Sequence, residues 1–163
     1  MKKLIIGFLL TLLSTLSVAT PVPLTEVSEV VQIEKMSKKQ IYDSAKVWVV
    51  KSFKSSKSVI EYEDAASGII MGKGNMPYPC SGFSCLMYED YKIFFTIRID
   101  TKDNKARITF SDLMMRIPEN SLMAASDVPL TSDKNKQNVA LKLKEIVEGF
   151  KVDVQKNNLS SDW

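Results

Sequence analysis

The feature that most restricts the fold of this chain is a regular alternation of apolar and polar residues over Tyr91–Asp100. Every second residue from Tyr91 to Ile99 is apolar, and the residues between them are mostly polar. A second alternating run, residues 106–111, has its apolar residues at even-numbered positions. Because successive side chains of a strand point to opposite faces, each run predicts a strand with one buried face. The short separation of the two runs predicts an antiparallel hairpin.

Charge selects the register of this hairpin. One register that keeps both apolar faces on the same side places Arg98 directly opposite Arg107, which puts like charges together. A shift by two residues places Asp100 opposite Arg107 and leaves Asp103 and Asn104 as a two-residue turn. Opposite charges stabilise a cross-strand pair, and Asp and Asn tolerate the positive φ of tight turns. We therefore predict the second register.

A helix is predicted over residues 37–53. Ser37, followed three residues later by Gln40, has the form of a capping box, in which each side chain binds the other residue's backbone N–H. Apolar residues then recur at helical spacing; they are Ile41, Ala45, Trp48 and Val49.

A second amphipathic helix is predicted near the end of the chain, capped by Ser132 or Asp133. Gly149 within it costs about 1 kcal/mol relative to alanine, which indicates a close packing contact at that position. The apolar stripe consists of Val139, Leu143, Ile146, Val147, Phe150 and Val154.

The remaining segments complete an α+β pattern. We predict a first strand over 28–34 and a hairpin formed by 59–64 and 69–73, with Gly68 at positive φ. Residues 75–90 and 113–130 are predicted to be irregular. The order is β-α-β-β-β-β-α, which predicts a curved antiparallel sheet with both helices on one face.

The N-terminus has the pattern of a signal peptide over residues 1–19. Two lysines precede the apolar run Leu4–Leu16, and Ser17–Ala19 supplies small residues at the cleavage site. The alternative is an uncleaved anchor, but a spanning helix needs about 20 apolar residues, and this run is shorter. We predict an exported, periplasmic or extracellular chain that does not span a membrane. Its parts are an extended leader (20–27), one domain (28–157) and a frayed tail (158–163).

The chain has two cysteines, Cys80 and Cys85, in a segment rich in Pro and Gly. Cysteine thiols of exported proteins are usually oxidised, so a disulfide is the simplest prediction. Zinc requires about four ligands, and the chain has no histidine and no further cysteine. A thioredoxin-type redox pair has two intervening residues, whereas four separate these cysteines.

Several segments in this order resemble a bacterial family of secreted proteins, described as a domain of unknown function with a TBP-like fold. They are Trp48 and Phe53 in the first helix, IEYEDAASGIIMGKG in the first hairpin and FTIRIDTKDNKARITFSD in the second. The resemblance covers about residues 28–155. It implies a helix-flanked curved antiparallel sheet and export, and it implies no activity, catalytic residue or cofactor. The cysteine segment departs from the family pattern.

The composition excludes several functions. Without histidine the chain lacks the most common general base and the histidine-dependent triads. Removal of residues 1–19 takes away two lysines and no acids, so the formal net charge falls from +3 to +1, which gives no electrostatic basis for nucleic-acid binding. No metal ligand set is predicted. A hydrolase that uses Glu61 and Glu63 as an acid–base pair is the enzymatic alternative.

The outer face of the sheet is the candidate binding face. It is predicted to present Lys92, Phe94, Arg98 and Arg107, which suit an envelope protein, a glycan or a lipid headgroup. An ordinary solvated antiparallel face is the alternative.

A groove between the sheet and the C-terminal helix is a second candidate. Met114, Met115 and Met123 are predicted to line its mouth, unless Trp48, Phe150 and Val154 fill the space and leave no pocket. The function predicted from the sequence is therefore a non-enzymatic, exported binding or envelope-associated accessory module whose ligand is unknown.

Overall fold

The computed structural model describes residues 20–53 and 60–159, so the predicted signal peptide and residues 160–163 of the predicted tail lie outside the described part. The α+β class and the predicted order of elements are confirmed, with one further strand and a 3₁₀ helix. The elements are β1 (Glu26–Gln32), α1 (Lys38–Ser52), β2 (Ile60–Asp64), β3 (Ile69–Pro77), the 3₁₀ helix η1 (Gly82–Met87), β4 (Lys92–Lys102), β5 (Lys105–Ile117), β6 (Ser126–Pro129) and α2 (Asp133–Leu159).

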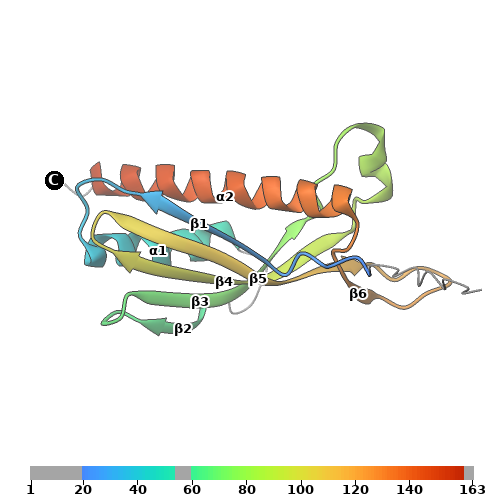
Figure 1. Ribbon diagram of the computed structural model, residues 1–163, viewed down its shortest axis with the longest axis horizontal. Coiled ribbons are helices and arrows are strands. Elements are labelled where there is room, and N and C mark those ends of the chain that lie inside the picture. Colours follow the sequence, from blue (N-terminus) through green and yellow to red (C-terminus); the bar gives the residue numbers. More distant parts are fainter. Residues whose placement is uncertain (1–19, 54–59, 160–163) are drawn as a thin grey trace, which may run out of the picture.

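The sheet is antiparallel throughout, with the strand order β1-β5-β4-β3-β2. Strand β6 pairs with Met114–Ile117, on the side of β5 that β4 leaves open. It therefore shares this edge of the sheet with β1, and the two form one interrupted edge strand (Figure 1). The leader is attached at the interruption, where the backbone N–H of Leu24 donates to the carbonyl of Leu130 at 2.9 Å.

The predicted register of the β4–β5 hairpin is confirmed. Asp100 lies opposite Arg107, and Arg98 lies opposite Thr109. Asn104 adopts φ 62° in the two-residue turn. Gly68 closes the β2–β3 hairpin at φ 76°, as predicted, and a Cβ there would lie 2.5 Å from the hydroxyl of Thr101.

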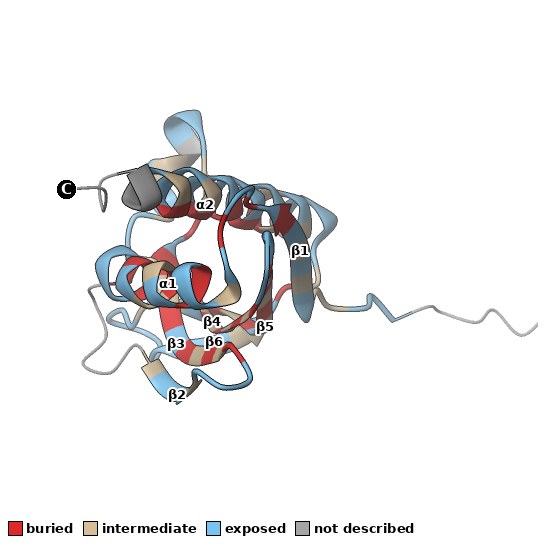
Figure 2. Cartoon of the chain, turned by 90° about the vertical axis from the view of Figure 1, so that its left-hand side faces the viewer, coloured by how far each residue is buried: buried red, intermediate tan, exposed pale blue. Residues whose placement is uncertain are grey.

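Both helices cover one face of the sheet, and the buried residues lie between the two layers (Figure 2). The predicted capping box begins α1: the backbone N–H of Ser37 donates to Oε1 of Gln40 at 2.9 Å, and the hydroxyl of Ser37 accepts from the backbone N–H of Gln40. The two helices meet at Trp48 and Phe150, whose ring centroids are 5.0 Å apart in an edge-to-face arrangement. The predicted apolar stripe of α2 is buried except for Ile146, which is partly buried.

The prediction of an irregular connection over 113–130 was wrong in part, because only residues 118–125 and 130 are irregular. Strand β5 continues to Ile117, and β6 returns along it. The continuation requires a β-bulge, because Thr96 pairs with Ser111 whereas Phe94 pairs with Met114. Asp112 supplies the extra residue at φ 54°. The bulge moves the buried positions of β5 from even to odd numbers, which hides the strand from a search for alternation.

The predicted close contact at Gly149 was also wrong. A Cβ built at Gly149 has nothing within 4 Å apart from the helix itself. The residue faces outward from α2, so its cost in helix propensity is not offset by packing.

Candidate functional site

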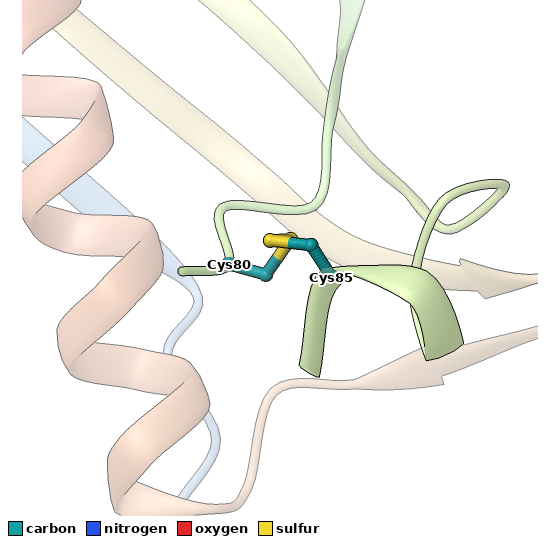
Figure 3. Close-up of a disulfide and its surroundings, with 2 residues drawn as sticks. All are labelled: Cys80 and Cys85. Atoms are coloured by element: carbon teal, nitrogen blue, oxygen red, sulfur yellow. A yellow bond between two sulfur atoms is a disulfide. The ribbon is translucent and has the colours of Figure 1, made fainter. Parts of the chain in front are cut away.

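The segment between β3 and β4 presents large apolar side chains to solvent. The predicted disulfide is present and joins Cys80 to Cys85, with their Cα atoms 5.3 Å apart (Figure 3). The prediction of an irregular segment over 75–90 was wrong in part, because β3 extends to Pro77 and η1 spans Gly82–Met87. The disulfide ties η1 back to the chain that leaves β3.

Three large apolar side chains on η1 face solvent, and we call them the apolar tip. Phe83 is 86% exposed, Leu86 is 68% exposed and Met87 is 74% exposed. Phe83 and Leu86 stand at positions i and i+3 of one short 3₁₀ helix, so they lie on the same side of it, and Met87 follows Leu86 directly. Single exposed apolar residues are ordinary, but a rigid group of this kind is typical of an interaction surface.

Three tyrosines, which we call the tyrosine collar, hold the base of this turn. The ring centroid of Tyr88 lies 4.9 Å from that of Tyr78 and 5.1 Å from that of Tyr91. The hydroxyl of Tyr78 donates to Oδ1 of Asn135 at the start of α2, at 2.8 Å. The backbone N–H of Tyr78 donates to the carbonyl of Tyr91 at 2.9 Å. The turn is therefore fixed to both the sheet and α2.

A shallow groove runs along α2 beside this turn. One hollow of about 430 Å³ lies between residues 76–81 and the face of α2 that bears Leu141 and Lys142. A second hollow of about 330 Å³ shares Met76 and Pro77 with the first and extends past Gly149. The glycine therefore widens the groove instead of making a close contact.

Most of the space between the sheet and α2 is filled by side chains. Trp48, Phe150 and Val154 are at most 5% exposed, so this part is core, and the hollows lie at its margin beside Met76 and Pro77. The structure does not bring the three methionines together. Met115 is buried in the core, Met114 lies on the opposite face of β5, and Met123 is 60% exposed beyond the end of that strand.

The predicted outer-face residues lie on one face but form two groups. In the first group Arg98 and Arg107 converge on Asp100. Nη2 of Arg98 is 2.8 Å from Oδ1 of Asp100, and Nη2 of Arg107 is 3.2 Å from Oδ2. The hydrogen bonds from Arg98, followed by those from Arg107, lower the pKa of the Asp100 carboxyl against the opposing effect of burial.

The second group surrounds Phe94 and Lys92, nearer the opposite end of β4. The guanidinium of Arg116 lies over the ring of Phe94, 4.4 Å from its centroid. Nη2 of Arg116 also lies 2.6 Å from Oδ2 of Asp127 on β6. Lys92 stands directly opposite Arg116. The ring predicted to be an open contact surface is therefore covered by a cation–π contact.

A small hollow of about 190 Å³ lies at the turn end of the β4–β5 hairpin, beside Asp100. We call it the basic hollow; its lining residues include Val30, Asp100, Lys102, Lys105 and Arg107. The two lysines were not among the predicted site residues. The register would have identified them, because the pairing of Asp100 with Arg107 also places Lys102 opposite Lys105.

The structure does not support the acid–base pair of the enzymatic alternative. The side chain of Glu61 is 47% exposed and lies 3.3 Å from Nζ of Lys73. That of Glu63 is 43% exposed and lies 2.7 Å from Nζ of Lys46. A carboxyl that acts as a general acid near neutral pH must be buried away from positive charge. Each of these two glutamates is instead exposed and lies beside a lysine. Within residues 20–53 and 60–159, no cluster of His, Cys, Asp or Glu could hold a metal ion.

Residues 28–116 match the model of a family described as "Domain of unknown function (DUF4468) with TBP-like fold". The chain belongs to this family. The match confirms the family and the TBP-like fold that the sequence resembles, and it carries no information on export. No curated protein matches the chain.

Two crystal structures share the fold. A DUF4468 family protein from Bacteroides ovatus has a TM-score of 0.63 and 18% identity, over 79% of this chain and 85% of its own. A TBP-like protein from Parabacteroides distasonis has a TM-score of 0.62 and 17% identity, over 80% of this chain and 92% of its own. At this level of identity the likeness concerns the fold alone. None of the described helices has the length and apolar character required to cross a bilayer.

Proposed function

We propose that this DUF4468 protein is an exported, non-enzymatic accessory module that associates reversibly with the lipid surface of the cell envelope. The apolar tip is the part that enters the membrane interface. The observation that supports this function most strongly is the exposure of Phe83, Leu86 and Met87, between 68% and 86%, on a turn closed by a disulfide.

The disulfide supports two parts of this proposal. The closed loop contains Phe83, and Leu86 and Met87 follow Cys85 directly on the same 3₁₀ helix, so little conformational entropy is lost when these side chains meet a partner. Disulfides also persist mainly in oxidising compartments, which supports export. Both arguments rest on the bond between Cys80 and Cys85.

The surroundings of the tip favour a bilayer as the partner. Tyrosines are enriched at the level of lipid headgroups, where the ring is in an apolar environment and the hydroxyl is hydrated. Tyr88 and Tyr91, which are partly buried directly behind the tip, suit this level, whereas Tyr78 is buried and its hydroxyl is bonded to Asn135. A second exposed apolar pair, Leu122 (91%) and Met123 (60%), lies in the β5–β6 connection, at the same end of the long axis (Figure 1).

The expected association is weak. Full burial of one Phe, Leu or Met side chain contributes about 1.5–3 kcal/mol, so the three together contribute at most about 4.5–9 kcal/mol. This gain is offset by the loss of translational and rotational freedom on binding. A single acyl chain likewise gives only marginal, reversible anchoring. We therefore expect fast exchange between the bilayer and solution.

Vesicle flotation tests this function. Wild-type protein is mixed with vesicles of phosphatidylethanolamine that contain a minor share of phosphatidylglycerol, and the floating fraction is measured. Phe83→Asp is expected to abolish flotation, because a charge would have to enter the apolar layer. Val50→Asp, at a valine that is 54% exposed on α1, is the matched control and should float like wild type.

The salt dependence separates apolar insertion from binding of headgroups by lysine and arginine. Insertion of the tip should change little as salt is raised, because screening weakens charge pairs and not apolar burial. Either of two results would contradict the proposal. One is wild-type protein that stays in solution at every lipid concentration, and the other is a Phe83→Asp variant that floats as well as wild type.

A further inference from the structure

We propose that the basic hollow binds a small, doubly charged oxyanion of the phosphate type. The hollow lies at the turn end of the β4–β5 hairpin, at the other end of the long axis from the apolar tip (Figure 1). The inference does not depend on membrane association, and either proposal can fail while the other stands.

The first observation is an unfavourable pair of charges. Lys102 and Lys105 are direct cross-strand partners on the outer face of the sheet. Like charges in direct opposition destabilise a strand pair. Neither lysine has an ion pair with any residue that the structure describes. A bound anion would remove this repulsion.

The nearby carboxylates do not neutralise the two lysines. Asp100 is already shared by Arg98 and Arg107. Asp103, in the turn itself, is directed toward the helix side, where its Oδ1 accepts a hydrogen bond from the backbone N–H of Lys38 at 2.7 Å. Among the residues that line the hollow, two lysines and one arginine therefore face a single carboxylate. This excess of two positive charges matches a divalent anion.

The second observation is that Asp100 fixes the guanidinium of Arg107 while leaving some of its N–H donors available. Both of its hydrogen bonds to Asp100 use Nε and Nη2, at 3.3 and 3.2 Å. The side chain is 57% exposed, and Nη1 makes no hydrogen bond to any residue that the structure describes. A guanidinium carries five N–H donors in a rigid plane, so the edge away from Asp100 remains available to an oxyanion.

The size and lining of the hollow limit the ligand to one compact group. A volume of about 190 Å³ accommodates a tetrahedral oxyanion and its hydration water, but not a large organic molecule. One wall is Val30, which is 56% exposed and supplies no hydrogen bond from its side chain. Two mobile ammonium groups beside one fixed guanidinium are a suitable set for phosphate. The phosphate can be free or can belong to a phosphomonoester.

Nuclear magnetic resonance tests the site with inorganic phosphate as the probe. Backbone amide shifts are followed during a titration at constant ionic strength, with chloride as the balancing anion. We expect saturable shifts confined to residues 100–107 and the neighbouring part of β1. Glycerol 3-phosphate is titrated in parallel: tighter binding than inorganic phosphate identifies an esterified source, and equal or weaker binding identifies the free ion.

The double variant Lys102→Gln, Lys105→Gln should weaken phosphate binding by about tenfold for each lysine removed, a factor that corresponds to about 1.4 kcal/mol. The matched control is Lys51→Gln, Lys134→Gln, which removes the same charge from exposed positions on the two helices and should bind like wild type. The double variant should also unfold at a higher temperature than wild type in low salt without phosphate, because the repulsion is gone.

Two results would overturn the inference. One is a wild-type titration with no saturable shifts at the hairpin end, which is independent of any variant and of its folding. The other is equal phosphate affinity in the double variant and in the control. Flotation on vesicles through the apolar tip is unaffected by either result, so failure of this inference is distinguishable from failure of the proposed function.

Discussion

Replacement of Asp100 by asparagine should destabilise the protein by about 2 kcal/mol at pH 7. The carboxylate accepts hydrogen bonds from Arg98 at 2.8 and 3.0 Å and from Arg107 at 3.2 Å, and its side chain is only 18% exposed. A hydrogen bond to a charged group contributes about 1.5–3 kcal/mol, and an exposed ion pair contributes about 0–1 kcal/mol. Because Arg98 is 41% exposed and Arg107 is 57% exposed, we take the lower part of each range.

The stability difference between wild type and Asp100→Asn should decrease as the pH is lowered. Arg98, and then Arg107, lower the pKa of the Asp100 carboxyl in the folded protein. The carboxyl of an unfolded chain titrates near about 3.9. The stabilisation is therefore complete above that value and is lost as the pH falls through the lower pKa of the folded state. The difference between wild type and Asp100→Asn should be full at pH 7 and should shrink below about pH 4.

Urea unfolding, followed by circular dichroism across this pH range, measures the difference. Asp43→Asn is the matched control, because Asp43 pairs with Lys39 at 2.7 Å on an exposed helix surface and its side chain is 56% exposed. This control should lose less than about 0.5 kcal/mol. A difference for Asp100→Asn that stays the same from pH 7 to below pH 4, or that is no larger than the control, would refute the reasoning.

Three further predictions concern the covalent state and the helices. Intact mass of exported protein should fit a chain that starts at Thr20 and lacks two hydrogens, which return on reduction; free thiols in protein purified without reductant would contradict the disulfide. Gly149→Ala should raise the free energy of unfolding in urea by about 0.5–1 kcal/mol, because the added Cβ meets open space, and a loss of stability would mean that the position is crowded. Phe150→Ala should lower the same quantity by about 3–5 kcal/mol, because the ring is fully buried against Trp48; a loss below about 1 kcal/mol would show that the two layers are not packed in this way.

The elements predicted well are those determined by short-range chemistry. The register of the β4–β5 hairpin follows from the charges of Asp100 and Arg107 once the apolar faces are aligned. The start of α1 follows from the capping box of Ser37 and Gln40. In both cases the interacting residues are close in sequence, so no knowledge of the tertiary structure is needed.

The elements predicted poorly depend on a distant partner or on an unusual backbone conformation. Strand β6 has four residues, ends in Pro129 and is defined only by its pairing with the end of β5. That end is displaced by the bulge at Asp112; Asp tolerates a positive φ, but the residue type alone does not show that it adopts one inside this strand. Gly149 was assigned to a close contact because of its cost in helix propensity alone, whereas its surroundings depend on the tertiary packing.

The candidate sites divide in the same way. Sequence alternation placed Lys92, Phe94, Arg98 and Arg107 on the outer face, but it did not show that Arg116 covers the ring of Phe94. The apolar tip contains residue types that are common in protein cores and show no periodic pattern, so the sequence does not reveal that they are exposed. The structure reveals it, because other residues form the core. The basic hollow required the register and the shared carboxylate together.

Methyl-resolved nuclear magnetic resonance with spin-labelled lipid in the vesicles tests the central claim most directly, because it reads the position of unmodified side chains relative to the bilayer. Signals from the methyl groups of Leu86 and Met87 should broaden most as labelled lipid is added. Those of Val47, 45% exposed on α1, and of Met71, half-buried on β3, should be unchanged. Absence of broadening at Leu86 and Met87, or equal broadening at Val47, would contradict insertion of the apolar tip into the membrane interface.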